Sequence, residues 1–525
     1  MHQQNLLTDS FNSLYLYFGI PGAILIFLTL QIHRRYPHRP VLPPSPGRSY
    51  PIIGHLAIVP KAESWLAFME WGKKLGPIYR LNLAGKNVLI LCNHQVAADL
   101  LDRRSAIYSN RANNIVAGKI MTGGLAYAFL SHTELWKRMR RASQEALSRT
   151  MVNRYHYMME TEAYLILHQI IQNPLHWDDH LRRASSSLFL SVLYGTPTAL
   201  NSTDPNIVRV NRYVEETVAA AAPGAFLVEY FTWMEHLPRW MCKWRRHAEG
   251  WFQTQTEMFD GLYGNVKRSM FSGKAVTSVA STLIENEKKY GLSDREATWC
   301  LATNYVAGAE TSSSTMAWFI MSMVLNPKIQ KRGQEELDGV VGRDHLPKLA
   351  DIPRLPYIQA LVKEILRWRP IAPLGLPHQL NVDDDYQGLY IPKDTIVVAN
   401  AWAMNHDESV WGPDANLFRP ERHLDDKGNL LNDGPSHVSF GFGRRICPGK
   451  YMANDILYIQ VACILWAFNI VNPEGALRPD PNSFIDNNLN VRPKHYEYLF
   501  ELRTPTVREM IAQTLEFREQ PTSKM

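Results

Sequence analysis

The chain has 525 residues, 46% of them hydrophobic and 11% aromatic, which is ample for a large hydrophobic core. The net charge of +6, from 56 basic and 50 acidic residues, is too small an excess to indicate a nucleic-acid-binding protein. The five cysteines are scattered and odd in number, which argues against a secreted protein stapled by disulfides and favours a reducing compartment.

An apolar segment near the N-terminus predicts a membrane anchor. Residues 10–33 contain no Asp, Glu, Lys or Arg, and residues 14–30 are mostly apolar, which is just long enough for a helix across a bilayer. Basic residues follow at Arg34, Arg35 and Arg39. This charge distribution places the remainder of the chain in the cytosol, although the same segment would also suit a buried core helix. We expect an anchor over residues 1–36 with a transmembrane helix at about 12–32.

The remainder of the chain predicts one mainly α domain with small β-sheets over residues 51–525, after a stiff Pro-rich hinge over 37–50. Helical periodicity indicates helices at 63–75, 133–149, 152–172, 178–193, about 293–326, about 356–368 and 451–468. β-type patterns indicate a hairpin over 78–92 and short strands between 377 and 400. The irregular stretch over about 404–446 is unusually long, and loops of that length are commonly functional.

Two polar residues lie in the middle of the longest predicted helix, in the run Ala307-Gly308-Ala309-Glu310-Thr311. Glu310 and Thr311 each bring a polar group that needs a partner in a buried helix. Ala307 and Gly308 lie one turn before Thr311, so small residues form a notch beside its hydroxyl. This arrangement suits a diatomic ligand with a hydroxyl and a carboxylate as a proton relay. It also suits a helix that packs closely through small residues, with Thr311 bonded back to a carbonyl.

Cys447 lies in a glycine-rich run, Phe440 to Gly449, directly before a predicted helix. It has no CxxC partner, which excludes a zinc knuckle or a thioredoxin-like pair. A sulfur just before a helix N-terminus is favoured as a thiolate, and a thiolate in an apolar pocket is the proximal ligand of an oxygen-activating heme. A buried core cysteine in a glycine-rich loop is the alternative.

The pattern F-x-x-G-x-R-x-C-x-G, filled here by Phe440, Gly443, Arg445, Cys447 and Gly449, resembles the heme-binding loop of the cytochrome P-450 superfamily. The run 307–311 is similar to the oxygen-activating segment of that family, and the resemblance covers roughly residues 40–500. It implies the cytochrome P-450 fold with heme b as the cofactor. It also implies Cys447 as the axial ligand of the iron, with Thr311 and Glu310 as the catalytic proton relay.

The resemblance further implies which residues hold the heme and its loop. Contacts to the heme or its propionates are expected from Trp136, Arg140, Arg445, His378, Arg111, Phe440, Ala307 and Gly308. Glu364 and Arg367 share a helix face and can pair, and Arg422 is similar to the arginine that completes this structural network in the family. The family's variable segments, at about 112–130, 205–240, 300–311, 372–377 and 486–490, favour a hydrophobic substrate because apolar side chains dominate them. Candidate substrate contacts in them are Ile115, Ile120, Phe226, Tyr305, Leu374 and Leu376.

The implied function is that of a microsomal heme-thiolate monooxygenase, similar to fungal secondary-metabolism members. Such an enzyme uses O2 and electrons from NADPH-cytochrome P-450 reductase to hydroxylate or otherwise oxidise a hydrophobic small molecule. We expect a single-pass protein in contact with the lipid of the endoplasmic reticulum membrane, with its catalytic domain in the cytosol. Two alternatives are the same fold acting without external O2, in rearrangement or dehydration, and a non-enzymatic heme-based ligand sensor or carrier. The intact pair Glu310 and Thr311 favours the monooxygenase.

Overall fold

The computed structural model describes residues 40–519 except 223, 275, 432 and 488. The chain divides into two compact units, one of Met1–Pro43 with Asp383–Ile391 and one of Pro44–Val382 with Pro392–Met525. In the smaller unit, β5 (Asp384–Tyr386) and β6 (Leu389–Ile391) form an antiparallel hairpin, and the Tyr390 N–H donates to the Val41 carbonyl.

The predicted anchor over 1–36, its transmembrane helix at about 12–32 and the first residues of the hinge over 37–50 lie outside the described residues. Within residues 40–519, apart from the four gaps, none of the helices combines the length and the apolar character needed to cross a bilayer.

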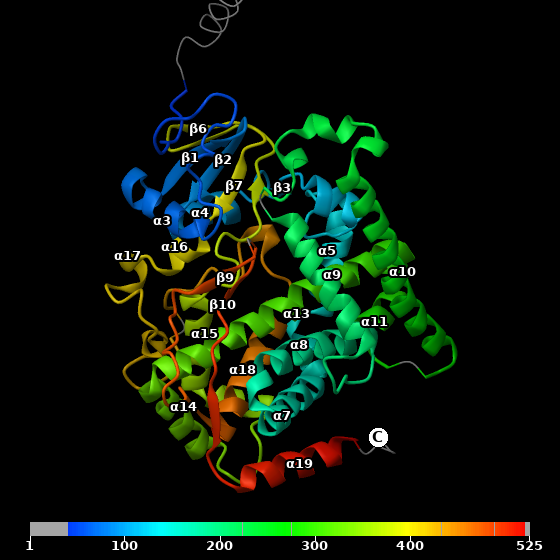
Figure 1. Ribbon diagram of the computed structural model, residues 1–525, viewed down its shortest axis with the longest axis vertical. Helices are drawn as coiled ribbons and strands as arrows, with labels where there is room; N and C mark the ends of the chain where they lie inside the picture. The colour runs from blue at the N-terminus through cyan, green and yellow to red at the C-terminus, as the bar shows by residue number, and fades with distance from the viewer. Residues whose placement is uncertain (1–39, 223, 275, 432, 488, 520–525) are drawn as a thin grey trace, which may run out of the picture. The chain divides into compact units, whose positions relative to one another are not determined.

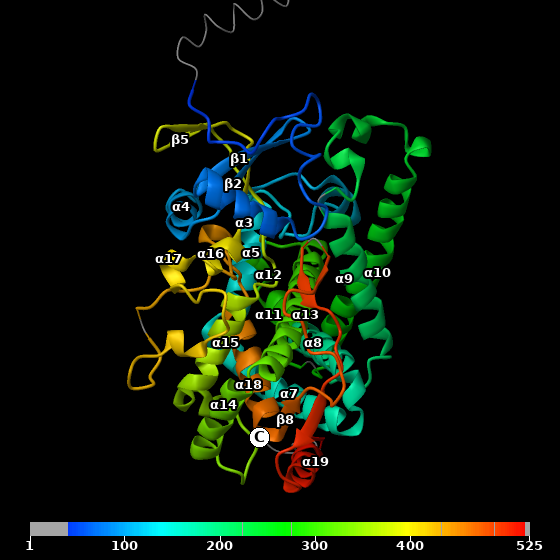
Figure 2. The ribbon, with the colours of Figure 1, turned by 60° about the vertical axis from the view of Figure 1, so that its left-hand side comes forward.

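The larger unit is mainly helical, as predicted. Its longest helix, α13, crosses the middle of the unit with α8 and α18 packed beside it, and α7 packs against α8 and α18 (Figures 1 and 2). The longer helices are α3 (Ser64–Leu75), α5 (Glu134–Ala146), α7 (His156–Gln172), α8 (Trp177–Tyr194), α9 (Pro205–Ala221), α10 (Lys243–Phe271), α13 (Asp294–Leu325), α14 (Pro327–Val340), α15 (Pro356–Trp368), α18 (Lys450–Ala467) and α19 (Thr506–Glu519). The shorter ones are α4 (His94–Ala97), α6 (Arg149–Val152), α11 (Val279–Glu285), α12 (Glu287–Tyr290), α16 (Ala401–Asn405) and α17 (Glu408–Trp411).

Helix α13 begins at a reciprocal cap that its sequence specifies. The Glu296 N–H donates to the Ser293 hydroxyl at 3.3 Å, and the Ser293 N–H donates to the Glu296 carboxylate at 2.9 Å. Most side chains beyond the first turn are buried on every side, because other helices surround α13. A helix with no solvent-facing stripe is typical of the centre of a large domain.

The β-sheets of the larger unit are small, and their strands adjoin chain segments that line the cavity described below. One sheet has the order β1 (Ile78–Leu83), β2 (Lys86–Leu91), β7 (Ile396–Ala399), β4 (His378–Gln379) and β3 (Asn110–Arg111). Two antiparallel pairs join β8 (Phe468–Val471) to β11 (Leu499–Leu502) and β9 (Phe484–Asp486) to β10 (Val491–Pro493). The pairing of β3 with β4 sets Arg111 opposite His378, two residues that lie far apart in the sequence.

The hairpin predicted over 78–92 is confirmed as the antiparallel pair β1 and β2. Its turn residues Ala84 and Gly85 have positive φ values of 49° and 86°, as a two-residue turn between strands of normal twist requires. The irregular stretch predicted over about 404–446 is also found, interrupted only by one-turn helices such as α17. The sequence did not indicate the two π-helical segments at Ala98–Arg103 and Ile115–Met121.

Candidate active site

A cavity of ≈ 400 Å³ lies in the larger unit, between α13 and the loop that precedes α18. Its walls are mostly apolar, and they also receive side chains from α5, α8, α9 and β4. The predicted site residues that line it are Arg111, Trp136, Arg140, Ala307, Gly308, Thr311, Leu374, Leu376, His378, Phe440, Arg445 and Cys447. The structure therefore brings together residues that span more than 300 positions of the sequence.

The loop that carries Cys447 is held in a tight path by its own backbone. The Cys447 N–H donates to the Phe440 carbonyl at 2.8 Å, which closes the loop. Gly443 has a φ of +52°, and a Cβ at this position would lie 2.1 Å from the Leu101 carbonyl oxygen. The loop can follow this path only with glycine there.

Burial and local polar groups act on the Cys447 thiol in opposite directions. Burial raises its pKa, while the Gly449 N–H and the cations of Arg140 and Lys450 lower it, and the net pKa lies above the ordinary value. Desolvation is the largest of these effects in the absence of a metal ion. A bound metal ion would add a positive charge that favours the thiolate.

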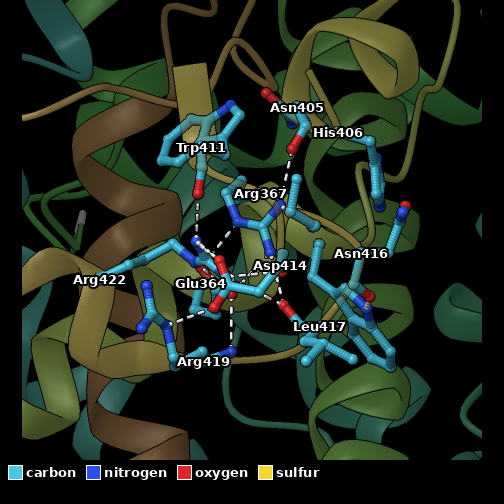
Figure 3. Close-up of polar contacts among 12 residues, drawn as sticks. Glu364, Arg367, Asn405, His406, Trp411, Asp414, Asn416, Leu417, Arg419 and Arg422 are labelled. Atoms are coloured by element: carbon cyan, nitrogen blue, oxygen red, sulfur yellow. Dashed lines mark hydrogen bonds and ion pairs between the residues drawn. The ribbon is translucent and has the colours of Figure 1, made fainter. Parts of the chain in front are cut away.

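A buried network of ion pairs holds together the chain segments that surround the Cys447 loop (Figure 3). The Arg367 guanidinium donates to both carboxylate oxygens of Glu364, at 2.7 and 2.8 Å, and both side chains are fully buried. Arg422 Nε donates to Glu364 Oε1 at 3.1 Å, so the predicted trio is in contact. His423, to which the sequence assigned no role, also contacts the Glu364 carboxylate, with its Nε2 at 2.9 Å from Oε2. Burial alone would raise the pKa of Glu364, but hydrogen bonds from Arg367 and His423 lower it to about 2.

The network reaches the cysteine loop through Asn405. Arg367 Nη1 donates to the Asn405 carbonyl at 2.7 Å (Figure 3). The Asn405 side chain accepts from the Val438 N–H at 3.0 Å and donates to the Ser439 hydroxyl at 3.1 Å. Val438 and Ser439 directly precede Phe440, so the buried ion pair positions the start of the loop.

Three arginines point to a dianionic ligand of the cavity. Arg111, Arg140 and Arg445 all line it, and among the lining residues that the structure describes there is no Asp or Glu. Burial and mutual repulsion lower the pKa of Arg111 to about 9 and that of Arg445 to about 8. The Arg140 Nε–H has no hydrogen-bond partner among the described residues. Because buried cations without a carboxylate partner are costly, this arrangement favours a bound anion.

The remaining contacts of these cations fix their orientation. The Arg445 guanidinium lies 4.2 Å from the centre of the Trp136 ring and donates to the Ser109 carbonyl at 2.8 Å. Arg111 donates to the carbonyls of Leu376 and Pro377. His378 Nδ1 lies 2.8 Å from the Tyr108 carbonyl, and burial beside Arg111 lowers the pKa of His378 to about 3, so its imidazole is neutral.

The opposite wall of the cavity is the middle of α13. The Thr311 hydroxyl donates to the Ala307 carbonyl at 2.6 Å, so its oxygen remains free to accept a hydrogen bond. Gly308 lies against α8, where an added Cβ would be 1.9 Å from Phe189 Cζ. The back-bonded hydroxyl and the close contact at Gly308 are the features of the alternative reading, a helix that packs closely through small residues, while Ala307 and Thr311 line the cavity.

The close approach at Gly308 leads to a first prediction. Gly308→Ala should lower the free energy of unfolding by about 1–3 kcal/mol, because the new methyl group overlaps the Phe189 ring. Adding Phe189→Leu to this variant should restore part of the lost stability. Urea unfolding of the single and double variants measures both effects, and an unchanged midpoint in Gly308→Ala would show that the contact is not close.

Glu310 is not brought to the cavity. Its carboxylate contacts Arg182 at 3.3 Å and Arg492 at 3.5 Å, and the Ser314 hydroxyl donates to it at 3.3 Å. Neighbouring residues on an α-helix point about 100° apart, so Thr311 faces the cavity while Glu310 faces α8 and β10. The structure thus separates the two residues that were predicted to act as one relay.

The substrate contacts were predicted in the right segments but at partly different residues. Of the six candidates, Leu374 and Leu376 line the cavity, whereas Ile115, Ile120, Phe226 and Tyr305 do not. Those four pack into the main core instead. Side chains that the sequence did not single out line the cavity at Tyr127, Phe129, Phe189, Tyr213, Thr217 and Asn304.

The donor set fits a heme. Cys447 offers a sulfur from the loop wall, the three arginines match a planar group that bears two carboxylates, and the facing helix presents the small residues Ala307 and Gly308. This combination defines a heme-thiolate site of the oxygen-activating type.

The comparison with known proteins agrees. The chain belongs to the cytochrome P450 family, whose model, Cytochrome P450, matches residues 43–500. It is 43% identical to Cytochrome P450 monooxygenase 58 of Postia placenta over 483 residues, which cover 90% of this chain and 91% of that protein. A cytochrome P450 monooxygenase of Armillaria gallica is 43% identical over 484 residues, covering 90% and 92%. Cytochrome P450 monooxygenase iboC of Amanita muscaria is 32% identical over 561 residues, covering 95% and 98%.

These findings confirm the superfamily, the mainly α fold and the similarity to fungal members that the sequence predicted. The protein is a monooxygenase, with a heme iron as its cofactor and a redox partner as the source of electrons.

Proposed function

We propose that this chain hydroxylates or otherwise oxidises a hydrophobic small molecule in fungal secondary metabolism, with Cys447 as the axial ligand of its heme. One observation carries the proposal: the cavity joins the Cys447 sulfur to three arginines, with no carboxylate among its described lining residues. When bound, the heme supplies the reductive activation of O2 and the transfer of one oxygen atom to the substrate.

The chain's own residues hold the cofactor and exclude water. Arg111, Arg140 and Arg445 would bind the two heme carboxylates, and the Trp136 ring orients Arg445. Phe440 lies in the loop on the sulfur side, while Leu374 and Leu376 contribute to the apolar wall that receives the substrate. The Thr311 hydroxyl donates its proton to the Ala307 carbonyl. Its oxygen faces the cavity, where it can accept a hydrogen bond from a water molecule.

Thr311→Ala gives the second prediction. Loss of the hydroxyl should lower the amount of product formed per NADPH consumed by about tenfold. The reason is that protons are then delivered without the control of this hydroxyl, so NADPH is consumed without forming product. Thr311→Ser keeps the hydroxyl and should retain most of the coupling. NADPH consumption and product are measured in the same reaction, and equal coupling in Thr311→Ala and the wild type would exclude this role.

A basic surface supports an acidic electron donor such as NADPH-cytochrome P-450 reductase. Lys137, Arg141 and Arg444 line a surface hollow that also reaches Trp136, Arg140 and Glu145, the single acidic residue among its described lining residues, and Arg138 and Lys450 are further basic residues of the same segments. Trp136 and Arg140 line both this hollow and the cavity, so a donor bound here would lie close to the heme. Charge complementarity would accelerate such an encounter and make it sensitive to salt.

The membrane location rests on the sequence of the first 39 residues. The uncharged segment at 10–33 and the arginines after it support a single-pass anchor in the endoplasmic reticulum membrane, with lipid as a partner and the catalytic domain in the cytosol.

Labelled oxygen tests the proposed reaction. The protein, the reductase and NADPH are incubated with terpenoids, polyketides and indoles under 18O2, and the products are examined by mass spectrometry. We expect a product that contains one 18O atom and is absent when reductase is omitted. A product that forms equally without O2 or reductase would instead indicate rearrangement or dehydration.

A further inference from the structure

A second polar cluster lies at the cavity, on the side of Arg140. Tyr127 and Asn304 both line the cavity and are buried, with exposed fractions of 6% and 5%. The Tyr127 hydroxyl donates to Asn304 Oδ1 at 2.6 Å, and Asn304 Nδ2 donates to the Ser143 hydroxyl at 3.1 Å. Behind them, Ser143 Oγ lies 3.3 Å from Cys300 Sγ, and the Cys300 thiol donates to the Met139 carbonyl.

The direction of these hydrogen bonds decides what the pair can offer a ligand. A phenol has one proton, and Tyr127 gives it to Asn304, so its oxygen can only accept from another group. Asn304 has two N–H groups and gives one to Ser143, so the other remains as a donor. Burial holds the pKa of Tyr127 well above its ordinary value, so the phenol remains neutral. The pair therefore presents one acceptor and one donor side by side.

A hydroxyl group is the complement of such a pair, because it both donates and accepts. An ether or a ketone can only accept, and a hydrocarbon can do neither. The described wall of the cavity contains no carboxylate that would favour a cationic amine, and the heme carboxylates would match its three arginines.

We propose that Tyr127 and Asn304 form a polar anchor that selects substrates which already carry a hydroxyl group on an otherwise apolar skeleton. This inference rests on the proposed function and narrows its substrate class. It also places the enzyme after a reaction that introduces the hydroxyl, either an oxygenation or a hydration of the same skeleton.

Matched probe molecules test the anchor. Cedrol, cedryl methyl ether and cedrane form one set, and farnesol, farnesyl methyl ether and farnesene form another. Binding is followed by the change in heme absorption and, independently of the heme spectrum, by the rise in melting temperature. We expect the alcohol of a set to bind wild type about tenfold more tightly than its ether, and the hydrocarbon to bind most weakly.

Two variants test whether the preference for an alcohol depends on Tyr127 and Asn304. Tyr127→Phe alone would leave Asn304 Oδ1 without its donor and free to accept from an alcohol, so the first variant is the double substitution Tyr127→Phe with Asn304→Leu. It removes both partners, so the alcohol should fall to the affinity of its ether. Asn304→Leu frees the Tyr127 proton, so this variant should lose the alcohol preference and bind the ether more tightly than wild type does. Tyr155→Phe, at a buried tyrosine that does not line the cavity, is the control and should behave as wild type.

Three results would overturn the anchor: equal binding of alcohol and hydrocarbon by wild type, retention of the preference in the double variant of Tyr127 and Asn304, or binding of no alcohol by a protein that shows a thiolate-ligated heme. The last result would leave the proposed function intact. Absence of the thiolate spectrum would instead contradict the proposed function itself, so the two failures are distinguishable.

Discussion

Cys447→Ala is expected to reduce NADPH-dependent oxidation to background and to lower the heme content of the purified protein. The reason is that Cys447 lines the cavity, whereas the other four cysteines of the chain do not. Without this sulfur, nothing in the loop Phe440–Gly449 can ligate iron as strongly. Heme is quantified against protein, and product is measured with excess reductase.

Cys463→Ala provides the matched control. Cys463 lies on α18, the helix that follows the loop, and it is fully buried away from the cavity. This variant should lose some stability but keep its heme and its oxidation rate. Full activity in Cys447→Ala, or equal losses in both variants, would contradict the assignment of the ligand.

The second large effect is expected at Glu364. Glu364→Ala leaves Arg367 as a buried cation without a carboxylate, while Arg422 keeps only Asp414, which should lower the free energy of unfolding by about 3–5 kcal/mol. Since the network positions Val438 and Ser439, heme retention should fall as well. Urea unfolding and heme content measure the two effects.

An exposed ion pair supplies the comparison for Glu364. Glu335 lies 3.9 Å from Lys331 with 65% of its side chain exposed, so Glu335→Ala should change stability by less than about 1 kcal/mol. Acid unfolding gives a further test. The folded-state pKa of Glu364, about 2, lies below its ordinary 4.5, so its stabilising contribution is complete above the ordinary value and is lost as the pH falls toward 2. The stability difference between wild type and Glu364→Gln should therefore shrink over this range, and a constant difference would argue against the ionic network.

Helical periodicity was sufficient to predict most of the larger unit. The helices expected at 133–149, 178–193 and 293–326 correspond to α5, α8 and α13 within a few residues at each end. The reason is local: caps such as Ser293 and breakers such as Pro370 specify where a helix begins and ends. The two π-helical segments have no comparable local signal, because the sequence pattern of one wide turn resembles that of an α-helix.

The residues of the cation cluster and the cysteine loop were also predictable, because each belongs to a short sequence pattern. The orientation of Glu310 was not. Helix α13 is buried on all sides, so its sequence has no polar stripe to show which residues face the cavity and which face Arg182 and Arg492.

The polar anchor could not be inferred from sequence for a different reason. Tyr127 lies in an irregular segment, and its partner Asn304 is 177 positions away. Asn304 in turn bonds to Ser143 across 161 positions. Such contacts depend on which helices pack together, and no pattern within a single segment records that choice.

The most direct test of the central claim is the absorption spectrum of the reduced protein under carbon monoxide. If Cys447 is the axial ligand of a heme in this cavity, the complex should show the red-shifted Soret band that a thiolate ligand produces. A Soret band at the position typical of a histidine-ligated heme, in a freshly purified and active protein, would contradict the account.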